Sequence, residues 1–185
     1  MIKTMIELSH WKDLVVPQKN KVTGCIPASY EWMIKYVGTN GIDFETFQEK
    51  FDLKERNSFK NVAAEINEAY PSINIKIKDD FKRGQEKIEF VRRLLSRDIP
   101  CLISIKKTVE EDLQGNYHIL RVVSINDQKL SVIWDADDSN MVKEFTLDDV
   151  ISRHNNFEGG KDVAWIQKKG NAISVLREII RRFLT

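Results

Sequence analysis

Residues 17–29 read PQKNKVTGCIPAS, and this stretch carries the strongest functional signal of the chain. A polar loop runs into Cys25, and Pro27 follows two residues later. Proline is favoured in the first turn of a helix, where its missing N–H removes no hydrogen bond. The stretch therefore predicts a helix that starts within a residue or two of Cys25, with Gln18 one short loop upstream.

This position would favour a reactive thiol. The partial positive charge at a helix N-terminus stabilises a thiolate, and the thiolate is the nucleophilic form of cysteine. Gly24 lacks a Cβ and would let a substrate backbone approach the sulfur. Cys25 alone is equally compatible with a small buried residue, because cysteine is common in protein cores. A catalytic role for Cys25 therefore depends on partner residues elsewhere in the chain.

Two candidate partners follow much later, on neighbouring predicted strands. Residues 117–125 and 129–134 have strand-like sequences, and residues 126–128 form a tight-turn signal between them. His118 lies near the start of the first strand, and Asp135 follows the second. A hairpin would bring them close, so that Asp135 orients the His118 ring as a base. Taken singly, His118 is compatible with a core histidine and Asp135 with an ordinary loop aspartate.

The fourth candidate is Gln18. Its side-chain amide could donate to the oxyanion of a tetrahedral intermediate, with the Cys25 backbone N–H as second donor. By itself Gln18 also fits an exposed polar loop residue. The order Gln18, Cys25, His118, Asp135 nevertheless supplies one candidate for each role, and this set predicts a catalytic site.

The remaining sequence predicts an α+β fold, because helical patterns come first and strand patterns second. We expect one domain over residues 1–185, with a mainly helical half to about residue 98 and a sheet half from about residue 99 that ends in a helix. The predicted helices cover residues 26–37, 43–50, 57–70, 85–97 and 172–184. The predicted strands cover residues 72–78, 101–105, 117–125, 129–134, 142–145 and 163–167.

Composition excludes several classes of protein. The chain is 42% hydrophobic and 31% charged, which is typical of soluble globular domains. A net charge of +1 gives no electrostatic reason to expect nucleic acid or an anionic membrane as partner. The N-terminus does not resemble a signal peptide, and no run approaches the roughly 20 apolar residues of a membrane helix. Cys25 and Cys101 lie in unlike contexts, which favours reduced thiols and a cytoplasmic location.

No metal or cofactor is expected. The three histidines and two cysteines lack the spacing of metal ligands. The acidic run 135–138 lacks the closing glutamate of an EF-hand loop, and residues 159–162 lack the rest of a phosphate-binding loop. His154 is predicted at a solvated helix end and is a weaker alternative to His118 as the base.

These motifs resemble the papain-like cysteine peptidase superfamily, within it the branch of bacteriocin double-glycine leader peptidases and their free-standing relatives. The likeness covers roughly residues 14–38 and 99–138. The resemblance is carried by Gln18, the run Gly24-Cys25-Ile26-Pro27-Ala28-Ser29, Met33, the run Tyr36-Val37-Gly38, His118 and Asp135.

The resemblance implies a papain-like fold, with the Cys25 helix in the N-terminal half packed on an antiparallel sheet that carries His118 and Asp135. It implies Cys25 as nucleophile, His118 as base and acid, Asp135 as orienter and Gln18 as oxyanion donor. The chain departs from the usual family pattern in two places, since Ile26 follows the cysteine and Ala136 replaces a common proline. Residues 43–98 match no part of the family pattern.

The first functional hypothesis is a cysteine peptidase or amidase acting on a peptide or small amide through a covalent acyl-enzyme. An acyl transferase would use the same residues with a different acceptor. The second hypothesis is a non-catalytic module that binds a peptide or a protein partner on the same fold. The sequence leaves the substrate and the oligomeric state open.

Overall fold

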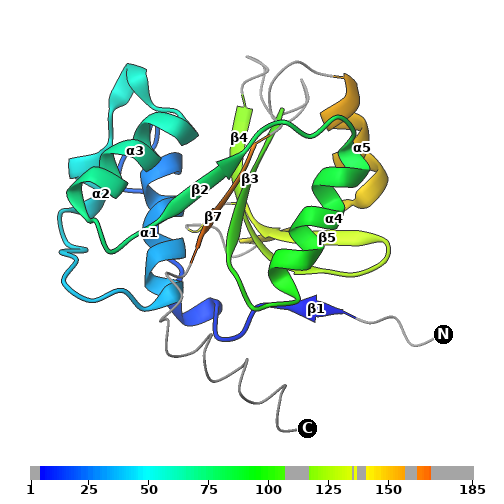
Figure 1. Ribbon diagram of the computed structural model, residues 1–185, viewed down its shortest axis with the longest axis horizontal. Coiled ribbons are helices and arrows are strands. Elements are labelled where there is room, and N and C mark those ends of the chain that lie inside the picture. Colours follow the sequence, from blue (N-terminus) through cyan, green and yellow to red (C-terminus); the bar gives the residue numbers. More distant parts are fainter. Residues whose placement is uncertain (1–4, 107–116, 135, 137–140, 157–161, 168–185) are drawn as a thin grey trace, which may run out of the picture.

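The computed structural model describes residues 5–106, 117–134, 136, 141–156 and 162–167. Figure 1 shows three layers, with a sheet between helices α1, α2 and α3 on one side and helices α4 and α5 on the other. The α-helices are α1 (Cys25–Val37), α2 (Phe47–Phe51), α3 (Phe59–Ala69), α4 (Gly84–Leu95) and α5 (Leu147–Asn156), and short 3₁₀ turns span Lys12–Leu14 and Lys54–Arg56.

Seven strands of the described residues form one antiparallel sheet in the order β2-β7-β3-β4-β5-β6, with β1 paired to β4. Their bounds are β1 (Ile6–Glu7), β2 (Ile75–Lys78), β3 (Cys101–Lys106), β4 (Tyr117–Ile125), β5 (Lys129–Ile133), β6 (Val142–Thr146) and β7 (Val163–Ile166). The turn between β4 and β5 closes as the sequence predicts, because the Asn126 backbone N–H donates to the Lys129 carbonyl over 3.0 Å.

Helix α1 lies at the centre of the first layer. Tyr30, Trp32 and Met33 are completely buried between the sheet and helices α2 and α3. Burying each such side chain stabilises the fold by roughly 1.5–3 kcal/mol. Gly38 ends the helix in the left-handed conformation, with φ of 71°, which glycine adopts without steric cost.

The predicted α+β class is confirmed, with helices followed by an antiparallel sheet and Cys25 in the first helix. The predicted division into halves is less sharp in the structure. Strands β1 and β2 lie within residues 1–98 but join the sheet, and helix α4 packs on the face opposite to α1. The predicted C-terminal helix over residues 172–184 lies outside the described residues.

Helix α5 is not among the predicted helix ranges, although the sequence places His154 at a helix end. Its apolar stripe is short, and its start is set by the Thr146 hydroxyl, which accepts from the Asp149 backbone N–H over 3.1 Å. It packs directly on α4, because a Cβ on Gly84 would lie 2.6 Å from the Ile151 Cα. No helix in the described part of the chain has both the length and the apolar character needed to cross a membrane.

Candidate active site

Cys25 is the first residue of α1 and is half-buried. Gly24 precedes it as the N-cap, and its carbonyl accepts from the Ala28 backbone N–H over 3.0 Å. The sulfur therefore sits at the positive end of a 13-residue helix, as the sequence predicted from Pro27. Such a helix end favours negative charge on a nucleophile or an oxyanion.

Cys25 opens on a groove of about 500 Å³ between the start of α1, the start of α3 and the sheet. Its lining combines apolar side chains with hydroxyl, amide and carboxylate groups. The lining residues are Val22, Thr23, Cys25, Ile26, Asn57, Ser58, Phe59, Ser104, Tyr117, Ile119 and Asp162. The groove therefore presents both apolar and hydrogen-bonding side chains beside Cys25.

The structure brings Gln18 and Cys25 to the same loop end. Gln18 is half-buried, and its Nε2 donates to the Asn20 carbonyl oxygen over 2.6 Å. A Cβ on Gly24 would lie 3.0 Å from the Gln18 Cγ and 2.5 Å from the Asn20 carbonyl oxygen. Glycine at position 24 thus allows the Gln18 side chain to pack directly beside the residue that precedes Cys25.

The loop before Cys25 is tied to residues 52–57. Asp52 accepts hydrogen bonds of 2.8 Å from both the Asn20 amide and the Thr23 hydroxyl. Asn57 donates to the Thr23 carbonyl oxygen and to Asp52, also at 2.8 Å each. Burial raises the pKa of Asp52, but the hydrogen bonds from Thr23, Asn57 and Asn20 outweigh this and hold it below its ordinary value.

A second tie comes from the sheet. Arg121 on β4 is 6% exposed, and its Nη1 donates to the Val16 carbonyl oxygen over 3.1 Å. Its Nε donates to the Ser29 hydroxyl over 3.3 Å, and that hydroxyl donates to the Cys25 carbonyl oxygen over 2.7 Å. Arg121 thus joins β4 to both ends of the loop. A charged residue inside an apolar strand was the signal that could have identified it.

His118 lies at the start of β4, next to two residues of the groove. Ser104 pairs with Ile119, and both line the groove with Cys25, so they lie on the α1 face of the sheet. Ile105 pairs with His118. Because successive strand residues point to opposite faces, the register places His118 on the face covered by α4 and α5. This face is opposite to the one that carries the groove and Cys25.

The surroundings of the His118 ring agree with that face. The ring packs edge-on against Trp134, with ring centres 4.7 Å apart, and its Nε2 lies 3.3 Å from the Trp134 carbonyl oxygen. Trp134 in turn packs against Phe145 of β6, which lies under Arg153 of α5. The hairpin does bring His118 beside the end of β5, as predicted. Asp135, the expected orienter, lies outside the described residues.

Cys101 and His154 are both buried. Cys101 is completely buried in β3, and burial raises the pKa of its thiol to about 12. His154 is 2% exposed at the end of α5, with Nε2 3.3 Å from the Phe81 carbonyl oxygen, so the predicted solvated position was wrong. Packing of α5 on α4 explains that burial. Within the described residues, no group of three or more His, Cys, Asp or Glu side chains could hold a metal ion.

Comparison with known proteins supports the fold. The crystal structure of a protein described as a "putative C39-like peptidase" from Bacillus anthracis matches with a TM-score of 0.60. The match covers 89% of this chain and 98% of that one, at 10% sequence identity. No family model matches the sequence, and no curated protein is significantly similar to it. At this identity the likeness establishes a C39-like, papain-like fold.

Proposed function

We propose that the protein is a cysteine-dependent peptidase or amidase with Cys25 as nucleophile. The observation that carries the proposal is the half-buried Cys25 at the start of α1, open to the groove and adjacent to Gln18. The likeness of the fold to a C39-like peptidase supports the same activity. The substrate class is a peptide or small amide that lies along the groove.

In the proposed reaction the base takes the proton of the Cys25 thiol. The thiolate attacks an amide carbonyl carbon, and a C–S bond forms while the C=O electron pair moves to oxygen. The oxyanion accepts hydrogen bonds from the Gln18 amide and the Cys25 backbone N–H. The C–N bond then breaks, and the amine leaves with a proton from the protonated base. Water hydrolyses the thioester, which releases the acid and restores the thiol. An acyl transferase would use another acceptor in place of water.

The proposal keeps His118 as the base and Asp135 as its orienter. That role requires the His118 ring to reach the α1 face of β4, whereas the observed register places it on the other face. A shift of one residue in the pairing at the start of β4 would bring it across, because such a shift moves each side chain to the opposite face. Replacement of His118 by alanine tests whether the ring serves Cys25.

The test is alkylation of native protein by iodoacetamide across pH 5 to 9. Because Cys101 is buried with a raised pKa, labelling of the folded chain reports on Cys25. We expect Cys25 to react faster at neutral pH than a free cysteine, and Cys25→Ala to abolish the signal. Cys101→Ala is the control and should leave it unchanged. Labelling only after unfolding would refute the proposed activity.

A second candidate is a non-catalytic module that captures a peptide in the same groove. The register of β4 favours it, because it places His118, the proposed base, on the face of the sheet away from Cys25. This candidate predicts slow alkylation of Cys25 together with protection of Cys25 by bound peptide. The same labelling series therefore distinguishes the two functions.

A further inference from the structure

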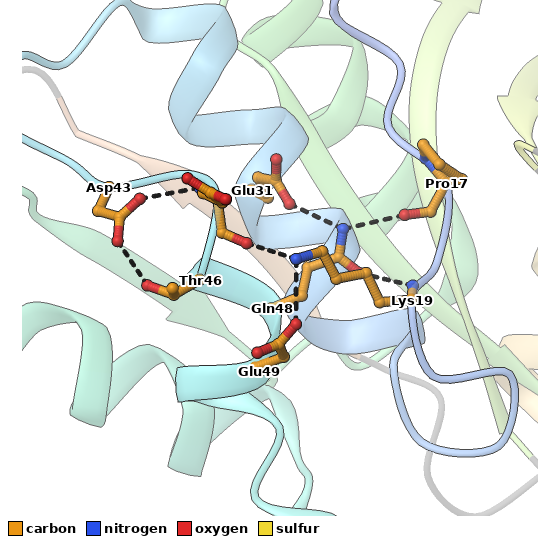
Figure 2. A network of polar contacts seen from close by, with 8 residues as sticks. Pro17, Lys19, Glu31, Asp43, Thr46, Gln48 and Glu49 are labelled. Carbon is orange, nitrogen blue, oxygen red and sulfur yellow. Dashed lines mark hydrogen bonds and ion pairs between the residues drawn. The ribbon is translucent and has the colours of Figure 1, made fainter.

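Residues 43–57, which the sequence left without a role, form the support of the loop that carries Gln18. Figure 2 shows the polar network at its centre, where Gln48 of α2 lies between the chain at residues 17–19 and Glu31 of α1. Gln48 is 4% exposed. A buried amide keeps its position only when its donors and acceptors are paired, so its partners define its role.

Gln48 contacts the backbone on both sides of Gln18. Its Nε2 donates to the Pro17 carbonyl oxygen over 2.9 Å, and its Oε1 accepts from the Lys19 backbone N–H over 2.9 Å. One side chain thus fixes the peptide groups that precede and follow Gln18. The direction in which the Gln18 side chain leaves the backbone is set by those two peptide groups.

Gln48 is itself anchored to the helix that begins with Cys25. Its Nε2 also donates to Glu31 Oε2 over 2.8 Å, and Glu31 is 3% exposed on α1. The other Glu31 oxygen pairs with Lys35 one turn later, over 2.6 Å. Gln48 therefore couples the backbone around Gln18 to the frame of α1, in which Cys25 is the first residue.

The approach to α2 is also fixed. Asp43 accepts from the Thr46 hydroxyl over 2.6 Å and from the Glu45 backbone N–H over 3.0 Å, which closes the turn before the helix. Lys19 Nζ reaches the Glu45 carbonyl and, over 3.2 Å, the Glu49 carboxylate. These contacts are exposed and worth little alone, since exposed pairs contribute about 0–1 kcal/mol. The buried Gln48 bonds are the main constraint.

We propose that Gln48 is a positioning residue that aims the Gln18 amide at the oxyanion formed on attack by Cys25. This inference rests on the proposed function and deepens it, because it assigns a role in transition-state stabilisation to a residue that does not touch the substrate. Displacement of a group by about 1 Å can cost about 10²-fold in rate, so the support of an oxyanion donor affects catalysis directly.

Two probes of Cys25 separate the oxyanion from the nucleophile. Attack on 4-nitrophenyl acetate forms a C–S bond and a tetrahedral oxyanion, then expels 4-nitrophenolate and leaves an acetyl thioester. Alkylation by iodoacetamide replaces iodide at carbon and forms no oxyanion. The ratio of the acylation rate to the alkylation rate therefore measures oxyanion stabilisation alone. A substitution that only alters the thiolate fraction of Cys25 changes both rates equally and leaves the ratio unchanged.

We expect Gln18→Ala to lower this ratio on the order of 10²-fold, as for other oxyanion donors. Gln48→Ala should lower it about 10-fold with little change in the alkylation rate. Because Gln48 acts through Gln18, the double variant Gln18→Ala/Gln48→Ala should be no worse than Gln18→Ala alone. Gln85→Ala, an exposed glutamine on α4, is the matched control and should leave the ratio unchanged.

Gln48→Ala leaves the Pro17 carbonyl and Glu31 without the Gln48 Nε2 donor. A second pair of variants tests the same role if Gln48→Ala does not fold. Gln48→Glu keeps the acceptor for Lys19 but sets two carboxylates against each other, and adding Glu31→Gln relieves that repulsion. The double variant Gln48→Glu/Glu31→Gln should have a higher acylation-to-alkylation ratio than Gln48→Glu alone. A structural role without positioning would instead change both rates together.

The outcomes are distinguishable. If the wild-type protein acylates no faster than a free thiol, the proposed function is refuted and the inference is refuted with it. If the wild-type protein is active but Gln48→Ala keeps the full ratio, or if the effects of Gln18→Ala and Gln48→Ala simply add, only the inference is refuted. The inference is supported if Gln48→Ala lowers the acylation-to-alkylation ratio in the wild-type background but causes no further decrease in the Gln18→Ala background.

Discussion

The loop from Val16 to Cys25 and the start of β4 border the same groove but are held in different ways. Three side chains from two distant segments bind the loop: Gln48 in α2, Asp52 directly after α2, and Arg121 in β4. His118, in contrast, is held by a neighbouring strand and an aromatic ring, on the face of the sheet away from Cys25.

The difference indicates which half of the proposed site is preorganised. The Gln18–Cys25 half is fixed by hydrogen bonds from the buried side chains of Gln48 and Arg121, and a buried polar group is costly to leave unpaired. The face that the His118 ring occupies follows the strand register, and one residue of shift would change that face. The proposed catalytic geometry is therefore built into the helical side and depends on register at the sheet side.

The largest expected effect comes from removing the base. If His118 serves Cys25, His118→Ala should slow acylation by 4-nitrophenyl acetate at pH 7 by about 10²–10⁴-fold, the usual range for a general base. His10→Ala is the control, since His10 stacks on Tyr36, away from the groove residues. Equal acylation rates for wild type and His118→Ala would show that His118 does not act on Cys25. That result would agree with the observed register of β4 and would favour the binding module.

Arg121 connects the two regions, so its loss should weaken the loop from the sheet side. Arg121→Met leaves the Val16 carbonyl and the Ser29 hydroxyl without their donor, and we expect about 3 kcal/mol lower unfolding free energy. Urea denaturation measures this. Arg97→Met, at an exposed arginine, should change it by less than about 0.5 kcal/mol. Similar values for the two variants would contradict the role of Arg121.

Gly24→Ala tests the packing of the loop itself. The new Cβ would lie 2.5 Å from the Asn20 carbonyl oxygen, so the loop must move. We expect a loss of about 2 kcal/mol and a reduced acylation-to-alkylation ratio, because overpacking typically costs about 1–3 kcal/mol. Gly38→Ala is the matched control. It strains a backbone that is in the left-handed conformation, but the new Cβ contacts no other atom. It should lower stability without changing the ratio.

The smallest expected effect is a pH dependence of the unfolding free energy, caused by Lys87, which contacts β3. Lys87 donates to the Ser104 carbonyl over 2.7 Å, and burial lowers its pKa from 10.5 to about 7, against the opposing charge of Asp162. Between those values the unfolded chain binds one more proton than the folded chain, so stability should rise with pH from about 7. Urea titrations should show a slope near 1 kcal/mol per pH unit up to pH 8.5.

The control for this slope is Lys87→Met, which should flatten it. Above about pH 9 the raised pKa values of Cys101 and Tyr30 act in the opposite direction, which is why the window ends earlier. A Lys87→Met protein with the same slope as wild type would show that another group titrates. Absolute stabilities are less informative, because the variant also removes the donor to Ser104.

Local signals in the sequence were sufficient for several elements of this protein. Pro27 and Gly38 mark the two ends of α1, and residues 126–128 mark the turn between β4 and β5. These features depend on backbone preferences of single residues, which act over a few positions. The α+β class follows from the order of such elements.

Only the tertiary structure assigned Gln48, Glu31 and Arg121 to the loop that holds Gln18, because their hydrogen bonds join residues 17 to 105 positions apart. It also decided the face of His118. Alternation predicts that His118 shares a face with Leu120, but not which helices cover that face, since both faces of this sheet are buried. The sequence thus determined the chemistry available at Cys25, and the packing of distant elements decided which residues can take part in it.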